Sequence, residues 1–296
     1  MYYMGNTRSI VATAALAAAA AAMSACSATD TSAAPVAAPD VVISTAGQTA
    51  EATAAAMRAA AAPKADNWVS VPASASSVPA GVLAPGAFID VGTAESGGSC
   101  TLGAGIRAGD RSGFVTAGHC DRYGDMVRLD SSTGAPLGVL SDADKSYDSV
   151  AKVALDYAAV WTASPAPTAA MVAGLPVAGV MTREAASKLP SGTPICFDGA
   201  TSGVTCSPLK LAGITSLLTD SVAVGGDSGS PVFVVDGNTG AATLLGIMSG
   251  SNADLTEVAY LDPALERLSA QALVDPTAAA AVAGDPRYSA NISTLN

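Results

Sequence analysis

The feature that most constrains the fold is the residue pattern after Ala87, where short apolar runs alternate with Gly, Asp, Ser and Pro. Turn signals recur about every ten residues, a spacing that favours a β-sandwich or β-barrel over βαβ units. The fold class is therefore predicted to be all-β. The predicted strands are Phe88–Val91, Gly113–Ala117, Met126–Leu129, Gly138–Leu140, Tyr157–Trp161, Val177–Met181, Pro194–Phe197, Gly213–Leu218, Val232–Val235, Thr243–Ser249 and Glu257–Tyr260.

One helix is predicted near the end of the chain. Asp262 suits the N-cap and Pro263 the first helical position. Leu265, Leu268 and Leu273 then recur at roughly helical spacing. The expected architecture is thus β-rich with a C-terminal helix.

The first residues have the character of an export signal. Met1 to Ser9 contains Arg8 and no acid, and Ile10 to Ala22 is an unbroken stretch of apolar or small residues. This stretch is too short to cross a bilayer core of about 30 Å as a helix. Residues 1–25 are therefore predicted to be a secretory signal, and the protein is expected to be secreted or held at the cell surface.

Two interpretations of Cys26 are open. The run Met23-Ser24-Ala25-Cys26 resembles a bacterial lipobox, although Met23 stands where leucine is usual. On that interpretation Cys26 is the lipidated first residue of the mature protein and anchors it to a membrane surface. The alternative is an ordinary secretory cleavage nearby, with Cys26 removed or left as a free thiol.

Composition divides the rest of the chain. Residues 26–86 are rich in Ala, Ser, Thr and Pro and lack the aromatic and branched residues that offset ordering entropy, so they are predicted to be a tether or short pro-segment. Residues 87–275 form the predicted folded domain, and 276–296 a loosely ordered tail. Of the 25 acidic residues only four lie in residues 1–85, so the acidity belongs to the folded part.

Charge and residue counts exclude several functions. A net charge of −11 argues against nucleic acid or anionic lipid head groups as partners, because phosphate binding needs clustered Lys and Arg. A single histidine and five cysteines without C-x-x-C spacing exclude a conventional zinc site. No metal and no organic cofactor is predicted, and the chain is expected to be a monomer.

Two separated motifs carry the chemistry. The run Phe114-Val115-Thr116-Ala117-Gly118-His119-Cys120 places the only histidine after a predicted strand. The run Gly226-Asp227-Ser228-Gly229-Ser230-Pro231 places a serine between glycines, which allow a backbone that exposes the hydroxyl and aims two N–H groups at one point. Together, in this order, they indicate nucleophilic catalysis by Ser228 with His119 as base.

Over residues 87–275 the chain resembles the chymotrypsin-like serine peptidases, whose signatures are TAGHC and GDSG(G/S)P. The resemblance implies two six-stranded antiparallel Greek-key β-barrels and a peptide or protein as substrate. It also implies an oxyanion hole formed by the N–H groups of Gly226 and Ser228. Asp227 is expected to be buried and to hold this turn in shape rather than to act as a base.

A carboxylate between the two motifs must orient the histidine, because the imidazole can accept the serine proton only in the right tautomer. Asp156, which precedes an alternating strand, is the best candidate. The competitors Asp142, Asp144 and Asp148 lie in a polar, loop-like stretch and are interpreted as solvated loop charges.

The cysteines fit an oxidising compartment. Cys100, Cys120, Cys196 and Cys206 permit three pairings. The loop from Cys196 to Cys206 is similar to a hairpin of the bacterial streptogrisin branch, and this resemblance implies the pairs Cys100–Cys120 and Cys196–Cys206.

The hairpin also departs from that branch. Phe197 stands where an arginine commonly pairs with the acid before the serine. Two explanations are open: another base, such as Arg183 or Lys210, reaches Asp227, or the turn is held differently.

For substrate recognition, the run Gly246 to Ser251 resembles the strand that pairs with the substrate backbone, so Ser249, Gly250 and Ser251 are candidate substrate-binding residues. The segment before Ser228 is mostly small or apolar, which favours cleavage after a small or apolar residue. Asp220 would add a preference for basic residues if it lined the pocket.

The leading hypothesis is an exported serine endopeptidase that forms an acyl-enzyme through His119, Asp156 and Ser228. The alternative is a catalytically idle protease fold that serves as a peptide-binding or adhesion module on the cell surface. An esterase with the same three residues is a third possibility.

Overall fold

The structure is a computed structural model that describes residues 66–72, 74–93, 97–129, 136–162 and 167–295. The predicted signal, Cys26 and most of the predicted tether lie outside the described residues. Within the described ranges no helix is long and apolar enough to cross a membrane.

The first of two sheets contains a closed antiparallel barrel. The strands follow one another in the ring order β14, β11, β12, β13, β16 and β15, and pairing of β14 with β15 closes the ring. These strands are β11 (Pro194–Gly199), β12 (Gly203–Ala212), β13 (Leu217–Asp220), β14 (Pro231–Asp236), β15 (Ala242–Ser251) and β16 (Leu255–Tyr260). At its margins lie β1 (Trp68–Val69), β9 (Met171–Val172) and β10 (Leu175–Val180), of which β10 runs parallel to β15.

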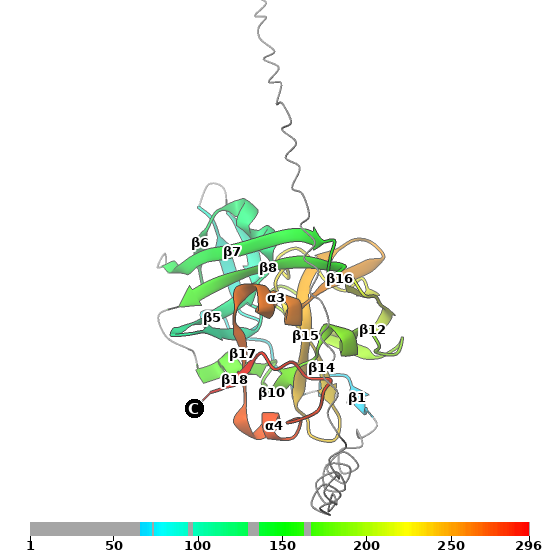
Figure 1. The fold of residues 1–296 in the computed structure, drawn as a ribbon. Helices are drawn as coiled ribbons and strands as arrows, with labels where there is room; N and C mark the ends of the chain where they lie inside the picture. Colours follow the sequence, from blue (N-terminus) through cyan, green and yellow to red (C-terminus); the bar gives the residue numbers. More distant parts are fainter. Residues whose placement is uncertain (1–65, 73, 94–96, 130–135, 163–166, 296) are drawn as a thin grey trace, which may run out of the picture. The chain divides into compact units, whose positions relative to one another are not determined.

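The second sheet combines strands from the first half of the domain with two strands from the C-terminal end of the chain (Figure 1). Its order is β18 (Ile292–Thr294), β17 (Gln271–Val274), β4 (Gly105–Ala108), β5 (Arg111–Thr116), β8 (Val153–Thr162), β7 (Pro136–Asp148), β6 (Met126–Arg128), β2 (Phe88–Val91) and β3 (Gly98–Thr101). The sheet curls, because the N–H of Leu102 donates to Ala87 and that of Gly103 donates to Val115. The connection after β3 therefore bridges β2 to β5.

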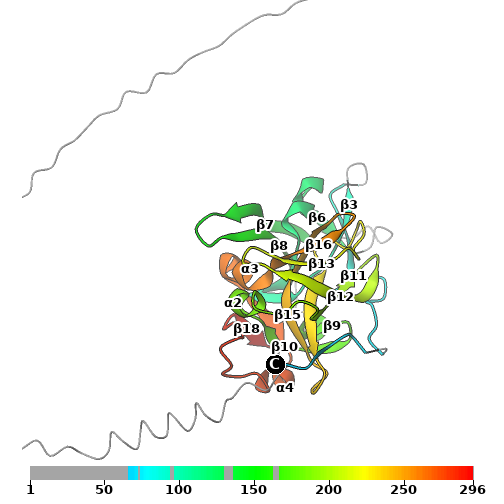
Figure 2. The same ribbon diagram turned by 90° about the vertical axis from the view of Figure 1, so that its right-hand side faces the viewer.

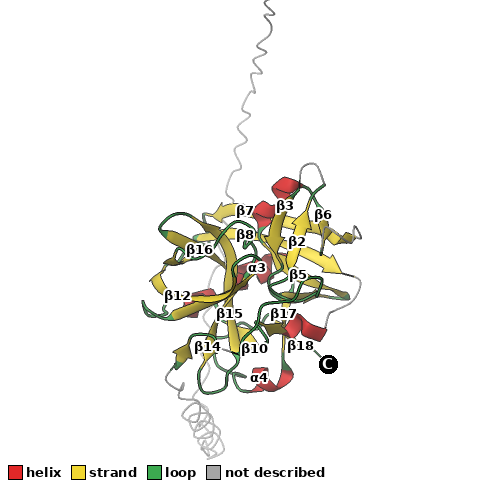
Figure 3. Cartoon of the chain, turned by 180° about the vertical axis from the view of Figure 1, so that it is seen from behind, coloured by secondary structure: helices red, strands yellow, loops and turns green. Residues whose placement is uncertain are grey.

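This architecture, a closed six-stranded barrel beside a second curled sheet, confirms the predicted all-β class and is consistent with the expected double barrel. Helices are short and few among the described residues, as Figures 2 and 3 show. They are η1 (Gly118–Tyr123), η2 (Pro167–Ala170), α2 (Arg183–Ala186), α3 (Leu261–Leu268) and α4 (Pro276–Ala280).

The predicted C-terminal helix exists as α3, but it begins earlier than expected. Tyr260 is its N-cap, and Asp262 lies in the first turn, where its carboxylate accepts a hydrogen bond from the N–H of Arg183. Leu265 and Leu268 are buried on the helix, whereas Leu273 belongs to β17. Ser269, in the left-handed conformation with φ of 49°, ends the helix before it could reach Leu273.

The prediction of a loosely ordered tail differs from the structure. β17 pairs with β4, and β18 runs parallel to β17. Arg287 forms ion pairs with Asp285 and with Asp66, which precedes β1. Alanine-rich composition suggested weak order, but backbone pairing and these ion pairs hold both ends of residues 66–295 to the sheets.

The prediction that Asp142, Asp144 and Asp148 lie in a loop is also wrong. They belong to β7, a strand of 13 residues that pairs with β8 over most of its length. This part of β7 is mostly solvent-exposed, so its polarity reflects exposure and not an absence of backbone pairing.

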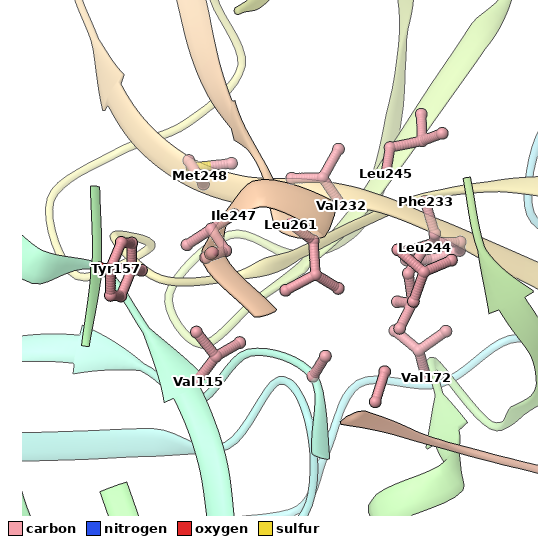
Figure 4. Packing of buried hydrophobic residues seen from close by; sticks show 14 of the residues in the cluster. Val115, Tyr157, Val172, Val232, Phe233, Leu244, Leu245, Ile247, Met248 and Leu261 are labelled. Atoms are coloured by element: carbon pink, nitrogen blue, oxygen red, sulfur yellow. The ribbon is translucent and has the colours of Figure 1, made fainter. Parts of the chain in front are cut away.

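One apolar core joins the two sheets (Figure 4). Val115 and Tyr157 extend from β5 and β8, and Ile247 and Met248 from β15. Leu261 of α3 lies among them. Because side chains from both sheets pack in one cluster, the strand ends at their junction are fixed relative to each other.

Candidate active site

The ends of two strands and the interior of a third place the predicted site residues at this junction. His119 lies in η1, directly after β5. Asp156 lies within β8, and Ser228 lies in the turn before β14. Gly118 allows the approach, because a Cβ on it would lie 2.2 Å from the carbonyl oxygen of Asp144 and 2.7 Å from that of Tyr157.

A chain of hydrogen bonds connects the three side chains. Ser228 Oγ lies 2.8 Å from His119 Nε2, and His119 Nδ1 lies 2.9 Å from Asp156 Oδ2. The backbone N–H of His119 donates to Asp156 Oδ1 at 2.9 Å. Because an ionised carboxylate only accepts, Nδ1 carries the proton and Nε2 of the neutral imidazole is free to accept from the serine hydroxyl.

Asp156 is buried, and its carboxylate accepts several hydrogen bonds from neighbouring protein groups. Its side chain is 1% exposed, against 16% for His119. Ser249 Oγ donates to Oδ2 at 2.5 Å and Lys145 Nζ donates to the same oxygen at 2.7 Å. Burial alone would raise the pKa of Asp156, but the hydrogen bonds from His119, Lys145 and Ser249 hold it below its usual value.

None of the three competing carboxylates forms a described hydrogen bond with the imidazole. Asp148 pairs with Arg267, and two backbone N–H groups together with Arg267 keep its pKa low. In the described residues neither Asp142 nor Asp144 bonds to His119. Geometry therefore favours Asp156 as the residue that orients the imidazole.

The turn that carries Ser228 is held by both sheets. Thr101 donates its N–H to the Ser228 carbonyl and its hydroxyl to the Gly226 carbonyl. Gly229 has φ of 94° and donates its N–H to Met248. A Cβ on Gly229 would lie 2.2 Å from Thr116 Oγ1, so both its conformation and its surroundings require glycine.

This turn leaves two donors free in the described part of the chain. The N–H groups of Gly226 and Ser228 donate to no described acceptor, while the N–H groups of Asp227, Gly229 and Ser230 are all bonded. Gly226 has φ of 99°, a conformation that L-residues with a Cβ rarely adopt. These two N–H groups are the pair that sequence reasoning assigned to the oxyanion.

Asp227 is fully buried and is satisfied by backbone donors. Its Oδ1 accepts from the N–H groups of Thr201 and Ser202 at 3.0 Å each, and its Oδ2 accepts from Val224 at 2.9 Å. The two bases proposed as partners are bonded elsewhere: Arg183 to the Ala151 carbonyl and Lys210 to Asp220. The turn is therefore held differently, by the tip of the β11–β12 hairpin.

Two disulfides brace these segments. Cys100–Cys120 joins β3 to η1 beside His119, and Cys196–Cys206 joins paired residues of β11 and β12. The pairing agrees with the one that the resemblance implied. Loops of this length contribute about 3 kcal/mol each in the chain-entropy model, and both loops contact the site.

Among the described residues, the end of the candidate substrate strand is unpaired along one edge. Pairing of β15 with β14 ends at Ile247, whereas pairing with β16 continues to Ser251. The Ser249 hydroxyl is committed to Asp156, and the Ser251 hydroxyl lies 3.1 Å from that of Ser221. Gly250 and Ser251 therefore offer backbone groups on an edge next to Ser228.

Two ionisable side chains that the structure singles out were missed by sequence reasoning. Lys145 lies directly opposite Asp156 in the β7–β8 register. Recognising residues 149–152 as a four-residue turn between two paired strands would have predicted this register, and with it the contact. Asp198 on β11 is fully buried, and neither carboxylate oxygen makes a hydrogen bond of normal geometry within the described residues. No sequence signal distinguishes such an acid from an ordinary turn residue.

Comparisons with known proteins give structural likeness only. No protein-family model matches the chain, and no curated protein matches it. A glutamic acid-specific serine protease is similar over 64% of this chain and 98% of its own, with 22% identity and a TM-score of 0.49. Protease A of Thermobifida fusca is similar over 65% of this chain and 98% of its own, with 22% identity and a TM-score of 0.47. The chymotrypsin of Cellulomonas bogoriensis is similar over 65% of this chain and 98% of its own, with 20% identity and a TM-score of 0.46.

The chemistry of these groups differs from that of a metal centre. Among the described residues, no cluster of three or more His, Cys, Asp or Glu side chains could hold a metal ion. The reactive atoms that the geometry brings together are a hydroxyl oxygen, an imidazole and a carboxylate.

Asp198 makes stability depend on pH. Burial raises its pKa from 3.8 to about 7, and a nearby backbone N–H of Ala173 offsets this only in part. Since the folded pKa is the higher one, stability is full below about pH 4 and falls as the pH rises to about 7. Asp198→Asn should therefore melt several degrees above the wild type at pH 8 and close to it at pH 4.

Calorimetry from pH 4 to 9 measures this difference. Asp125→Asn, at an exposed position, is the control and should show no such trend. An Asp198→Asn difference that is the same at pH 4 and pH 8 would contradict the raised pKa.

Proposed function

We propose that this protein is an exported serine endopeptidase. The observation that carries the proposal is the unbroken hydrogen-bond chain from Ser228 through His119 to a buried, ionised Asp156. A serine hydroxyl 2.8 Å from an imidazole nitrogen, with the imidazole itself oriented by a carboxylate, is the arrangement that activates a serine nucleophile. The two disulfides agree with an oxidising, extracytoplasmic location.

The reaction follows from the donors and acceptors present. Ser228 Oγ attacks the scissile carbonyl carbon as His119 Nε2 takes its proton, and Asp156 stabilises the resulting imidazolium. The oxyanion of the tetrahedral intermediate accepts from the N–H groups of Gly226 and Ser228. His119 then gives its proton to the leaving amine, and water, activated by the same imidazole, hydrolyses the acyl-enzyme.

The substrate backbone would bind in extended form. Gly250 and Ser251 present the free edge of β15 beside the nucleophile, which suits addition of one further strand by main-chain hydrogen bonds. Such binding uses groups that every peptide has, so it supports peptides as substrates over small esters.

Covalent labelling tests the proposed mechanism. A fluorophosphonate should react stoichiometrically with the wild type at Ser228, and Ser228→Ala or His119→Ala should lower the labelling rate by about 10⁴-fold or more. Intact-mass spectrometry measures the adduct, and Ser187→Ala, at the C-cap of α2, is a control that should label normally. A folded wild type that takes no label would instead favour a catalytically idle peptide-binding module.

Specificity should depend little on Asp220. Its carboxylate pairs with Lys210 at 3.0 Å, so its charge is offset by a neighbour, and the segment from 222 to 225 is small and apolar. In a peptide library we expect cleavage after small or apolar residues, with the same profile in Asp220→Asn. Cleavage after Lys or Arg that disappears in Asp220→Asn would show that Asp220 lines the pocket.

A further inference from the structure

A lysine lies against the carboxylate that orients the imidazole. Lys145 Nζ lies 2.7 Å from Asp156 Oδ2 and 2.9 Å from Ser249 Oγ. The lysine side chain is 51% exposed, whereas the aspartate it contacts is 1% exposed. The cation therefore approaches a buried anion from the solvent side, opposite it in the β7–β8 register.

Orientation of Asp156 does not require this lysine. The N–H of His119 already fixes Oδ1, and the Ser249 hydroxyl already donates to Oδ2. What Lys145 adds is a positive charge on the same oxygen that accepts from His119 Nδ1. A carboxylate shared between two cations stabilises each less than it would stabilise one alone.

Other charged groups on the elements around Asp156 do not reproduce this contact. Within the described residues, His119 and Lys145 are the charged groups paired with Asp156. The remaining ionisable groups on β7, β8, η1, β16 and α3 are Asp142, Asp144, Tyr147, Asp148, Tyr157, Asp121, Arg122, Tyr123, Glu257, Tyr260, Asp262, Glu266 and Arg267. Lys152 lies in the turn between β7 and β8, and β2, which also packs against η1, carries Asp90. Of these, Arg267 is paired with Asp148, and Arg122 contacts Tyr123.

We propose that Lys145 is a positioning residue whose charge lowers the pH at which His119 takes up its second proton. A neighbouring positive charge disfavours the imidazolium, so the imidazole stays neutral, and able to accept the serine proton, at lower pH than it otherwise would. The consequence for activity, a wider acid range, rests on the proposed peptidase function. The effect on His119 itself does not.

The single histidine of the chain makes the test direct. The full chain, prepared without a polyhistidine tag, gives one imidazole signal whose NMR titration reports His119 alone. In Lys145→Met the midpoint of this titration should rise by roughly one pH unit relative to the wild type. Lys145→Arg keeps the charge and should stay close to the wild type.

Two further variants separate charge from other causes. Lys145→Gln keeps a hydrogen-bond donor toward Asp156 and Ser249 but has no charge, so its midpoint should rise as in Lys145→Met. Lys188→Met removes an exposed lysine that pairs with Glu184 on α2, and it should titrate as the wild type does. A midpoint that is unchanged or lower in Lys145→Met and Lys145→Gln would overturn the proposal, as would an equal rise in Lys145→Arg.

A second readout separates this inference from the peptidase function. The acid limb of the fluorophosphonate labelling rate should move to higher pH in Lys145→Met together with the imidazole titration. A wild type that does not label, but whose titration responds to Lys145 as described, would refute the peptidase function and support the inference. Normal labelling of the wild type, together with an imidazole titration that does not respond to Lys145, would support the peptidase function and refute the inference.

Discussion

The site depends on one buried carboxylate that is kept ionised. Asp156 lies inside the protein at the junction of the two sheets, where an unpaired charge would be costly. Four donors prevent that cost: the N–H and Nδ1–H of His119, the Ser249 hydroxyl and the Lys145 ammonium. Because these donors come from η1, β15 and β7, the ionised carboxylate ties together the elements that carry the chemistry.

Hydrogen-bond donors likewise stabilise the buried carboxylate in the turn that carries Ser228. Asp227 is buried as completely as Asp156, yet within the described part of the chain it pairs with no cation and is satisfied by backbone N–H groups of its own turn and of the β11–β12 hairpin. A disulfide braces that hairpin, and Thr101 of the other sheet holds the carbonyls of Gly226 and Ser228. Asp198, by contrast, is buried, and neither of its carboxylate oxygens makes a hydrogen bond of normal geometry to a described residue.

Sequence reasoning was most successful where local chemistry fixes the residue. The glycines around Ser228 and the histidine after a strand could be recognised from their neighbours in sequence. Asp156, expected just before a strand, lies within β8. Reasoning failed where long-range pairing decides. β7 looked like a polar loop because one part of it faces solvent, and its pairing with β8 is what brings Lys145 to Asp156.

The prediction of a loosely ordered tail over residues 276–296 failed because long-range pairing also decides the structure there. Alanine-rich composition gave no sign that β18 would pair with β17 or that Arg287 would meet Asp66. Likewise, the absence of an arginine after Cys196 could be seen in the sequence, but its replacement by backbone donors could not, since that depends on how the hairpin tip folds over Asp227.

The central claim is that Asp156, through the tautomer it imposes on His119, activates Ser228. The most direct measurement is the fluorophosphonate labelling rate of Asp156→Asn against the wild type, with thermal unfolding followed in parallel. The account predicts a folded variant that labels about 10⁴-fold more slowly, because an amide can favour the wrong tautomer. A folded Asp156→Asn protein that labels at the wild-type rate would contradict it.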